Sequence, residues 1–355
     1  MIPISRPFIG AEEKEAVMAV LDSGMLAQGP CVAELEQRFA DLCGTKYAIA
    51  TSSGTTALHL ALLAHDIGPG DEVITTPFTF IASPNSVLFT GARPVFVDIE
   101  IDSFNLDPHK VEKAITPHTK AIMPVHLYGY MCDMDALQAI AQRHDLVIIE
   151  DAAQAVGATF NGRKAGSIGT GTFSLYATKN MMSGEGGMIT TNDESVAECC
   201  RLLRSHGMKK RYHHQILGYN FRLSDLHAAI GLAQMDRLTA FTRQRQANAT
   251  YLSQRLESVI LPQVKDGYEH VWHQYTVRLP EGNRDEAVLR LHEAGVGTGV
   301  FYPIPAHQHD YMRKVVGNVS LPIAEQMAQE VFSLPVHPHL TQADLAVIVA
   351  EVNKL

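Results

Sequence analysis

Helix-like and strand-like segments alternate along the chain from about residue 10 to residue 235. Apolar residues recur every three to four positions over 12–23 and 32–43, a spacing that predicts amphipathic helices. By contrast, 121–125 and 146–149 are continuous apolar runs, which are typical of parallel strands buried on both faces of a sheet. This alternation predicts a three-layer α/β domain with a mainly parallel sheet. Further short strands are expected at 47–51, 72–75 and 94–97.

The pattern changes after about residue 235. A long helix is expected over 238–259, and strands over 272–279 and 297–302 flank a helical segment at 284–293. A last helix, over 342–354, follows Thr341, a suitable N-cap. These elements predict a smaller α+β domain. Since 355 residues suffice for two domains, we expect a large domain over 1–235, which includes the N-terminal segment, and a small one over 236–355.

Composition and charge describe an ordinary globular chain. Apolar residues make up 46% and charged residues 19%, and the formal net charge is −9. Because no long basic run accompanies this acidic balance, nucleic acid is not an expected partner. The one basic cluster, at 209–214, is either a solvated loop or a rim that meets an anionic substrate such as a diphosphate.

Other sequence features bear on location and on metals. No apolar run approaches the ~20 residues of a membrane span, and the N-terminus lacks a signal-peptide layout. Five cysteines with no CxxC fit a reduced, cytoplasmic setting. The histidine pairs at 307 and 309 and at 337 and 339 have no cysteine or carboxylate at ligand spacing, so no metal site is expected.

Asp151 and Lys179 are the residues with the clearest chemistry. Asp151 follows a buried strand, at the end where open α/β sheets bind ligands, and Lys179 follows another strand-like run 28 residues later. A lysine amine that forms a Schiff base and a carboxylate that keeps a pyridine nitrogen protonated are what pyridoxal phosphate chemistry requires. Asp151 alone could be a helix N-cap, and Lys179 alone a solvated lysine. The apolar neighbours of Lys179 favour a desolvated, nucleophilic amine.

Other positions gain meaning beside this pair. The turn 52–56, Ser-Ser-Gly-Thr-Thr, lies between a strand and a helix, where it either cradles a phosphate or merely caps the helix. Gln154 is placed to complete a capping box with Asp151 or to bond the ring hydroxyl of the cofactor. Phe80 either stacks on a planar ring or belongs to the core.

Seven motifs in chain order resemble the DegT/DnrJ/EryC1/StrS sugar aminotransferases, which are fold-type I pyridoxal phosphate enzymes. Each motif is weak alone, whereas the ordered set is specific and covers nearly the whole chain. They lie at 28–30 (QGP), 53–58 (SGTTAL), 150–155 (EDAAQA), 173–179 (FSLYATK), 184–187 (GEGG), 218–222 (GYNFR) and 302–307 (YPIPAH).

The resemblance implies a role for each matching position. Lys179 would be the Schiff-base lysine, and Asp151 the partner of the pyridine nitrogen. Gln154 would contact the ring hydroxyl and Phe80 would stack on the ring, while the phosphate would be bound by Gly54, Thr55 and Ser174. Asn220 would reach the phosphate from a neighbouring subunit, which implies a homodimer with shared active sites. His307 and Met25 are candidate substrate contacts.

The expected reaction is a ping-pong transamination. Glutamate would give its amino group to the cofactor, which would pass it to a nucleotide-linked keto-sugar, a 4-keto-6-deoxyhexose. Relatives that carry a histidine in place of Lys179 are dehydratases, so the lysine favours transamination. The alternatives are a keto-cyclitol or 3-keto sugar as acceptor, a cofactor-binding regulatory protein without turnover, and a purely structural protein.

Overall fold

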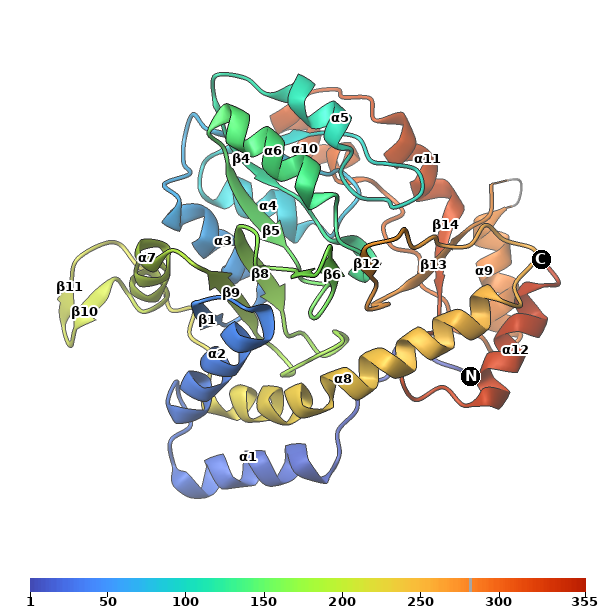
Figure 1. Ribbon diagram of the computed structural model, residues 1–355, viewed down its shortest axis with the longest axis horizontal. Coiled ribbons are helices and arrows are strands. Elements are labelled where there is room, and N and C mark those ends of the chain that lie inside the picture. The colour runs from blue at the N-terminus through green and yellow to red at the C-terminus, as the bar shows by residue number, and fades with distance from the viewer. Residues whose placement is uncertain (281–282) are drawn as a thin grey trace.

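The computed structural model describes residues 1–280 and 283–355. Its centre is a seven-stranded sheet in the order β1-β9-β8-β5-β4-β2-β3 (Figure 1). Among the described strands of this sheet β9 runs opposite to the other six, so the prediction of a mainly parallel sheet is confirmed. The strands are β1 Tyr47–Thr51, β2 Glu72–Thr75, β3 Arg93–Phe96, β4 Thr119–Met123, β5 Val147–Asp151, β8 Thr170–Ser174 and β9 Gly187–Thr191.

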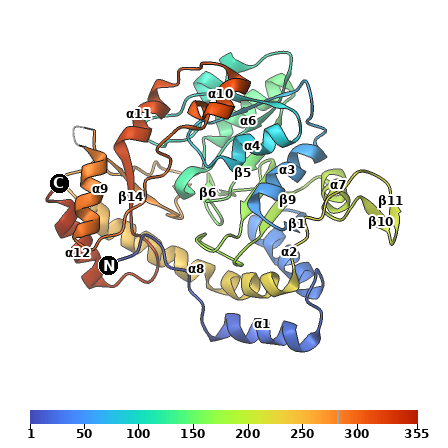
Figure 2. The same cartoon turned by 180° about the vertical axis from the view of Figure 1, so that it is seen from behind.

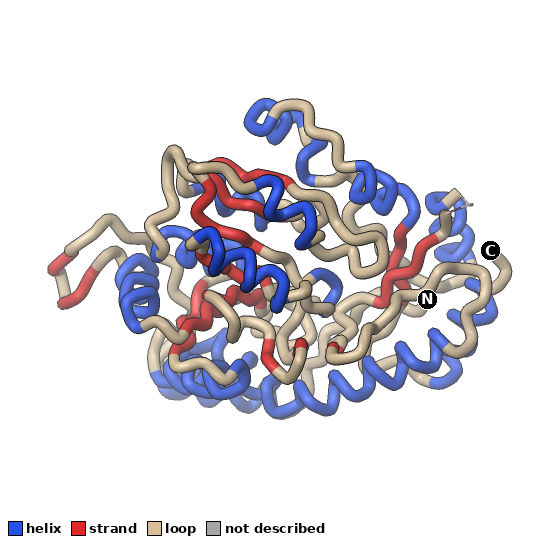
Figure 3. Tube along the Cα trace, turned by 45° about the horizontal axis from the view of Figure 1, so that its top comes forward, coloured by secondary structure: helices blue, strands red, loops and turns tan. Residues whose placement is uncertain are grey.

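Helices cover both faces of this sheet, which gives the predicted three layers (Figures 2 and 3). One face packs against α2 Pro30–Cys43, α6 Met134–His144 and α8 Asp225–Ser253. The other face packs against α3 Gly54–Ala64, α4 Ala82–Phe89 and α7 Glu194–Arg204. The outer helix α1 Ala11–Ser23 lies along α8, and the short α5 Pro108–Val111 follows β3. Because both faces are covered, the strands carry the continuous apolar runs seen in the sequence.

The C-terminal part is built on a two-stranded antiparallel sheet, β13 Tyr275–Arg278 with β14 Val331–Leu334. Its helices are α9 Arg284–Glu293, α10 Asp310–Val316, α11 Pro322–Glu330 and α12 Gln342–Val352. The backbone of Ile2 bonds to Gly295 and Gly297, so the start of the chain packs here, although the predicted large domain includes it. The division at residue 235 stays a prediction, and α8 runs across it.

Two predicted elements need correction. The long helix begins at Asp225, not at 238, because Ser224 caps its N-terminus by accepting a hydrogen bond from the His227 N–H. It ends at Ser253, not at 259. The predicted strand at 297–302 is wrong among the residues described, since only Gly299 forms a bridge there, with Ser333.

The basic cluster forms an exposed hairpin that projects beyond α7 at the left of Figure 1. It consists of β10 Met208–Lys210 and β11 His213–His214. A further small sheet joins β6 Thr159–Phe160 to β7 Arg163–Lys164 and β12 Tyr268–Glu269. Within the described ranges, no helix is long and apolar enough to cross a membrane.

Candidate active site

Asp151 and Lys179 meet at the carboxyl edge of the central sheet. Asp151 is the last residue of β5 and pairs in register with Thr172 of the neighbouring parallel strand β8. The chain leaves β8 at Ser174 and turns, and the Lys179 N–H donates to the Tyr176 carbonyl (2.9 Å). Because both segments leave adjacent parallel strands at the same edge, residues 28 positions apart in sequence lie close enough for their charges to interact.

The Asp151 carboxylate is buried, with 5% of the residue exposed. Ser83 Oγ, on α4, donates to its Oδ2 (2.7 Å), and the Ala153 N–H donates to its Oδ1 (3.2 Å). Burial raises the pKa of Asp151, and these two hydrogen bonds together with the charge of Lys179 oppose the rise. The carboxylate has further lone pairs, so it can also accept a hydrogen bond from an N–H or O–H group of a ligand.

Burial has the opposite effect on Lys179. Desolvation lowers the pKa of its amine to about 8, although the nearby Asp151 carboxylate acts to raise it. A larger fraction of the amine is therefore neutral near pH 8 than for an exposed lysine. A neutral amine is the form that attacks a carbonyl carbon and accepts a proton.

The start of α3 lies against the end of β8. Ser53 is the N-cap and accepts from the Thr56 N–H (3.2 Å). A Cβ on Gly54 would lie 2.9 Å from the Cβ of Ser174, so only glycine allows this approach. The structure therefore brings Gly54, Thr55 and Ser174 together. The first-turn N–H groups, which have no acceptor within the helix, form an anion-binding end.

Gln154 is held by two protein partners. Its Oε1 accepts from the Tyr128 N–H (2.7 Å) and its Nε2 donates to the Tyr302 hydroxyl (2.9 Å). The second N–H of the amide has no partner among the described residues and could donate to a ligand oxygen. Phe80 is 58% exposed, and its ring centre lies 6.5 Å from that of Tyr302. Phe80 therefore lies outside the core and presents a face to which a planar ring could bind.

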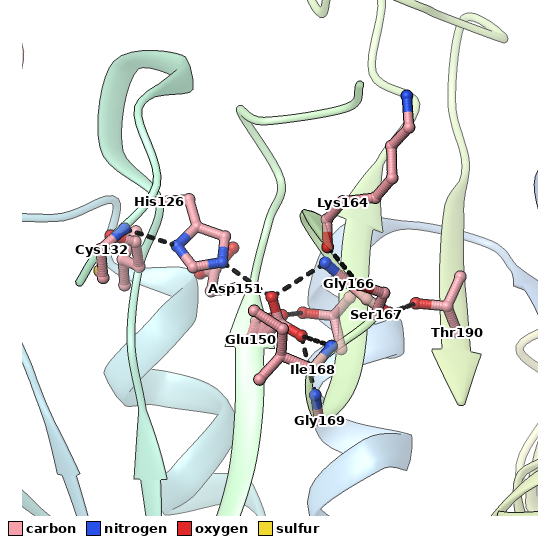
Figure 4. Close-up of polar contacts among 12 residues, drawn as sticks. His126, Cys132, Glu150, Asp151, Lys164, Gly166, Ser167, Ile168, Gly169 and Thr190 are labelled. Carbon is pink, nitrogen blue, oxygen red and sulfur yellow. Dashed lines mark hydrogen bonds and ion pairs between the residues drawn. The ribbon is translucent and has the colours of Figure 1, made fainter. Parts of the chain in front are cut away.

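Glu150 and His126 also support the site, a role that was not predicted from the sequence (Figure 4). Glu150 is fully buried and accepts from four donors: His126 Nε2 (3.0 Å) and the N–H groups of Gly166 (2.9 Å), Ile168 (2.8 Å) and Gly169 (2.9 Å). Burial acts to raise the pKa of Glu150, but the bonds from His126 and the two glycines outweigh it and lower the pKa.

His126 links Glu150 to the backbone of Asp151. Its Nδ1 accepts from the Cys132 N–H (3.2 Å), so the ring is neutral and carries its proton on Nε2. The backbone N–H of His126 donates to the backbone carbonyl of Asp151 (3.0 Å). Ser83 is a third contributor that the sequence did not indicate. Ser83 lies 68 residues from Asp151 and His126 lies 24 residues from Glu150, so no local motif marks these two contacts. Glu150 belongs to the motif at 150–155, but the motif alone does not assign it a role.

Three predicted site residues lie apart from Asp151 and Lys179. Asn220 is exposed. The carbonyl of the following residue, Phe221, accepts a hydrogen bond from the Ser52 N–H (2.8 Å), at the start of the turn 52–56. Met25 is 55% exposed and lines a groove of about 650 Å³ between α1, α2 and α8. His307 is buried, with Nε2 3.1 Å from Glu325 Oε1. Their predicted roles stay predictions.

The residues at the sheet edge fit pyridoxal phosphate. The start of α3 has no room for a Cβ at Gly54 and presents N–H groups suited to a phosphate. Asp151 offers a buried carboxylate for a protonated pyridine, and Lys179 an amine of lowered pKa for an aldehyde. Over the ranges 1–280 and 283–355, no group of three or more histidine, cysteine or carboxylate side chains is arranged to hold a metal ion.

Known proteins of similar sequence and structure carry the same fold. A family model, the DegT/DnrJ/EryC1/StrS aminotransferase family, matches residues 7–353. The chain is 45% identical over 351 residues to a pleiotropic regulatory protein of Geobacillus stearothermophilus, covering 96% of this chain and 94% of the relative. It is 44% identical over 369 residues to the GDP-perosamine synthase of Caulobacter vibrioides, covering 100% and 98%. The structure of S. venezuelae DesV matches at a TM-score of 0.93 and 42% identity, covering 97% and 94%.

These matches confirm the predictions of fold, family and cofactor. The family model spans almost the entire chain, and the sequence relatives align over nearly their full lengths. The chain belongs to the DegT/DnrJ/EryC1/StrS aminotransferase family and is a pyridoxal phosphate-dependent sugar aminotransferase.

Proposed function

We propose that this enzyme transfers an amino group from glutamate to a nucleotide-linked keto-sugar, a 4-keto-6-deoxyhexose, by a ping-pong mechanism. The observation that carries the proposal is the pairing, at the carboxyl edge of the sheet, of Lys179, whose pKa is lowered, with the buried carboxylate of Asp151. The name of the Caulobacter relative, a GDP-perosamine synthase, supports a nucleotide-linked sugar as the acceptor. The choice of a 4-keto sugar is based on the N-terminal segment 2–7 (IPISRP), which resembles that of relatives acting at C4.

Each residue has a definite task in this proposal. Pyridoxal phosphate, when bound, supplies an electron sink next to the amine-bearing carbon. Asp151 holds the proton on the pyridine nitrogen, and its burial strengthens that interaction. Lys179 Nζ removes the α-proton of glutamate and, in the second half-reaction, delivers a proton to the sugar carbon that receives the amine. Its pKa of about 8 suits both directions of transfer near neutral pH.

The remaining positions bind and orient. Gly54, Thr55 and Ser174 would hold the phosphate at the start of α3, and Phe80 would cover one face of the ring. The free N–H of Gln154 would meet the ring hydroxyl. Met25 and His307 are proposed sugar contacts.

The two half-reactions can be tested separately. Holoenzyme mixed with L-glutamate alone should release one 2-oxoglutarate per active site and convert the cofactor spectrum to the pyridoxamine form. Nucleotide-linked 4-keto-6-deoxyhexoses with different nucleotides, a nucleotide-linked 3-keto sugar and a keto-cyclitol should then be compared for the reverse spectral change. Recovery with only the 3-keto sugar or the cyclitol would contradict the proposed acceptor.

The same assay tests the alternative that the protein is a cofactor-binding regulator without turnover. The Geobacillus relative is named a pleiotropic regulatory protein, so this alternative needs a test. A regulator without turnover would bind the cofactor but show no spectral change with glutamate. That result, obtained with fully loaded protein, would refute the proposed function.

We also propose a homodimer in which Asn220 completes the partner's phosphate site. Asn220 is exposed at the base of the β10–β11 hairpin, as such a role requires. Lys179→Ala and Asn220→Ala proteins should each be weak alone. When mixed under conditions of subunit exchange, they should regain activity, because one site of the mixed dimer has both native residues. Absence of recovery in a demonstrated mixed dimer would contradict shared sites.

A further inference from the structure

The residue that follows Lys179 is held by a later segment of the chain. Asn180 is 5% exposed, and its Nδ2 donates to the Val271 carbonyl (2.8 Å). Its Oδ1 lies 3.2 Å from His273 Nδ1. Because an amide oxygen can only accept, His273 carries its proton on Nδ1 and donates it to Asn180. One buried amide therefore joins the loop that carries Lys179 to two positions 91 and 93 residues away.

The segment 271–273 lies where two hydrophobic cores of the protein meet. Val271 packs in the core around the central sheet, whereas Trp272 packs in the core of the C-terminal part together with Tyr275 of β13. Trp272 has a left-handed backbone (φ 50°), which is uncommon for a bulky residue. The Val271 N–H donates to the Gly129 carbonyl (3.1 Å), which fastens the segment to the large domain as well. A shift between the two cores would therefore move the atoms that Asn180 binds.

His273 is neutral beside Lys179. It is 7% exposed, and burial lowers its pKa well below the ordinary value of 6.5. The charges of Lys179 and Arg245 lower the pKa of His273 further. The imidazole therefore donates to Asn180 without placing a second cation beside the amine that carries the chemistry.

The loop that carries Lys179 is closed by its own backbone. The Ser183 N–H donates to the Leu175 carbonyl (2.7 Å), and the Lys179 N–H donates to the Tyr176 carbonyl (2.9 Å). These bonds shape the loop but lie within it. Asn180 adds two bonds of defined direction to another segment, one residue away from Lys179. They restrict the directions from which the amine can reach a reacting carbon.

We propose that Asn180, held by Val271 and His273, is a positioning residue that fixes the direction of the Lys179 amine and ties it to the C-terminal part of the protein. The inference goes beyond the proposed function, because it depends on the Lys179 amine and not on which donor or sugar is bound. Proton transfer depends on the distance and angle between the amine and the reacting carbon, and a misplacement of about 1 Å can cost about 100-fold in rate. Without the two bonds of Asn180, substrates should still bind, whereas proton transfer by Lys179 should slow.

Holoenzyme carrying Asn180→Ala tests this with two readouts. The first is the rate and L-glutamate dependence of the spectral conversion of the cofactor in a single turnover. This rate should fall about 10- to 100-fold, while the half-saturating glutamate concentration stays within about threefold of the wild type. The second is the pH midpoint of the visible absorption without substrate, which reports the proton on the Lys179 nitrogen. The midpoint should rise by about half a unit to one unit, because a looser loop admits water that stabilises the protonated nitrogen.

Two variants of His273 test the link to the C-terminal part. His273→Asn keeps an N–H donor at the δ position, whereas His273→Gln places its amide one bond farther out. The first should therefore stay near the wild-type rate, and the second should resemble Asn180→Ala. Asn353→Ala is the matched control, because Asn353 also joins two backbone groups, the Glu257 N–H (2.9 Å) and the Arg255 carbonyl (2.8 Å), near the C-terminus. It should match the wild type in both readouts.

A wild-type conversion rate and an unchanged pH midpoint in Asn180→Ala would overturn the inference, even if that variant unfolds at a lower urea concentration, since this combination shows a structural role alone. Equal rates in His273→Asn and His273→Gln would also overturn it. If Asn180→Ala does not fold, the two His273 variants give the decision. If L-glutamate fails to convert even the wild type, the proposed donor is refuted, while the pH midpoints still test the positioning role of Asn180.

Discussion

Replacement of Glu150 by glutamine should destabilise the edge of the sheet that carries Asp151. Two N–H groups, of Ile168 and Gly169, donate to Oε1, and two further donors, His126 Nε2 and the Gly166 N–H, meet Oε2. A glutamine has the same shape but turns one of these oxygens into an NH₂ group. The two buried donors that meet that oxygen would then face the NH₂ group, which cannot accept a hydrogen bond from them.

The magnitude follows from those two donors. Each buried donor left without an acceptor costs about 1–3 kcal/mol, so the free energy of unfolding should fall by about 2–6 kcal/mol at pH 7. His126 cannot relieve this by moving its proton to Nδ1, because Nδ1 already accepts from the Cys132 N–H. A displaced His126 would also disturb the active site, because its backbone N–H donates to the backbone carbonyl of Asp151.

Urea unfolding of Glu150→Gln and wild-type protein, followed by circular dichroism, measures this difference. Glu112→Gln is the control: its exposed carboxylate pairs with Arg143 and His144, and it should unfold at nearly the wild-type urea concentration. Because the fold lowers the pKa of Glu150 below its ordinary value of 4.5, the stability that the carboxylate confers is present above about pH 4.5 and is lost as the pH falls further. The gap between variant and wild type should therefore narrow in acid. Equal stability at pH 7 would refute the assigned hydrogen bonds.

Three further predictions concern the site directly. Lys179→Ala should abolish the borohydride-stable cofactor adduct on its tryptic peptide, and mass spectrometry that finds an adduct on another lysine would move the reactive amine elsewhere. Gly54→Ala should weaken cofactor binding by apoprotein about tenfold in an absorbance titration, because its Cβ would lie 2.9 Å from the Cβ of Ser174; unchanged affinity would argue against the phosphate turn. Ser83→Ala removes a 2.7 Å hydrogen bond to Asp151, which should raise the pKa of that carboxyl by up to about one unit. The acid limb of the pH–rate profile should move upward accordingly, and an unshifted limb would contradict it.

The central sheet was predictable because it is buried on both faces. Its strands appear in the sequence as continuous apolar runs, and the residues that follow them mark the ligand edge. The start of α8 was less predictable. Its buried residues come from different sides along its length, from Ala228 against the sheet to Leu252 in the C-terminal core, so no single apolar stripe runs through it. The segment 297–302 contains two glycines and does not continue as a strand beyond the bridge at Gly299.

The site was predictable only where local sequence marks it. Asp151 and Lys179 each follow an apolar run, and the turn at Gly54 has the composition of a helix start. Ser83 carries no such mark, because its significance arises from a contact with a residue 68 positions away. Tertiary packing alone decides that its hydroxyl reaches Asp151.

The neighbours Glu150 and Asp151 show how one strand assigns two carboxylates to different tasks. Successive residues of a strand point to opposite faces, so the pair separates at the end of β5. Glu150 meets four N–H donors and has a lowered pKa, which makes it an ionised anchor for the 166–169 loop at neutral pH. Among the described residues Asp151 meets two donors, and burial raises its pKa despite them, so its charge is not fully compensated. An ionised carboxylate that the fold leaves short of donors is a strong acceptor for the protonated nitrogen of a bound ring. Glu150 binds the N–H groups of the 166–169 loop and so holds the end of β5 in place. The Asp151 carboxylate does not bind these N–H groups and remains available to the cofactor.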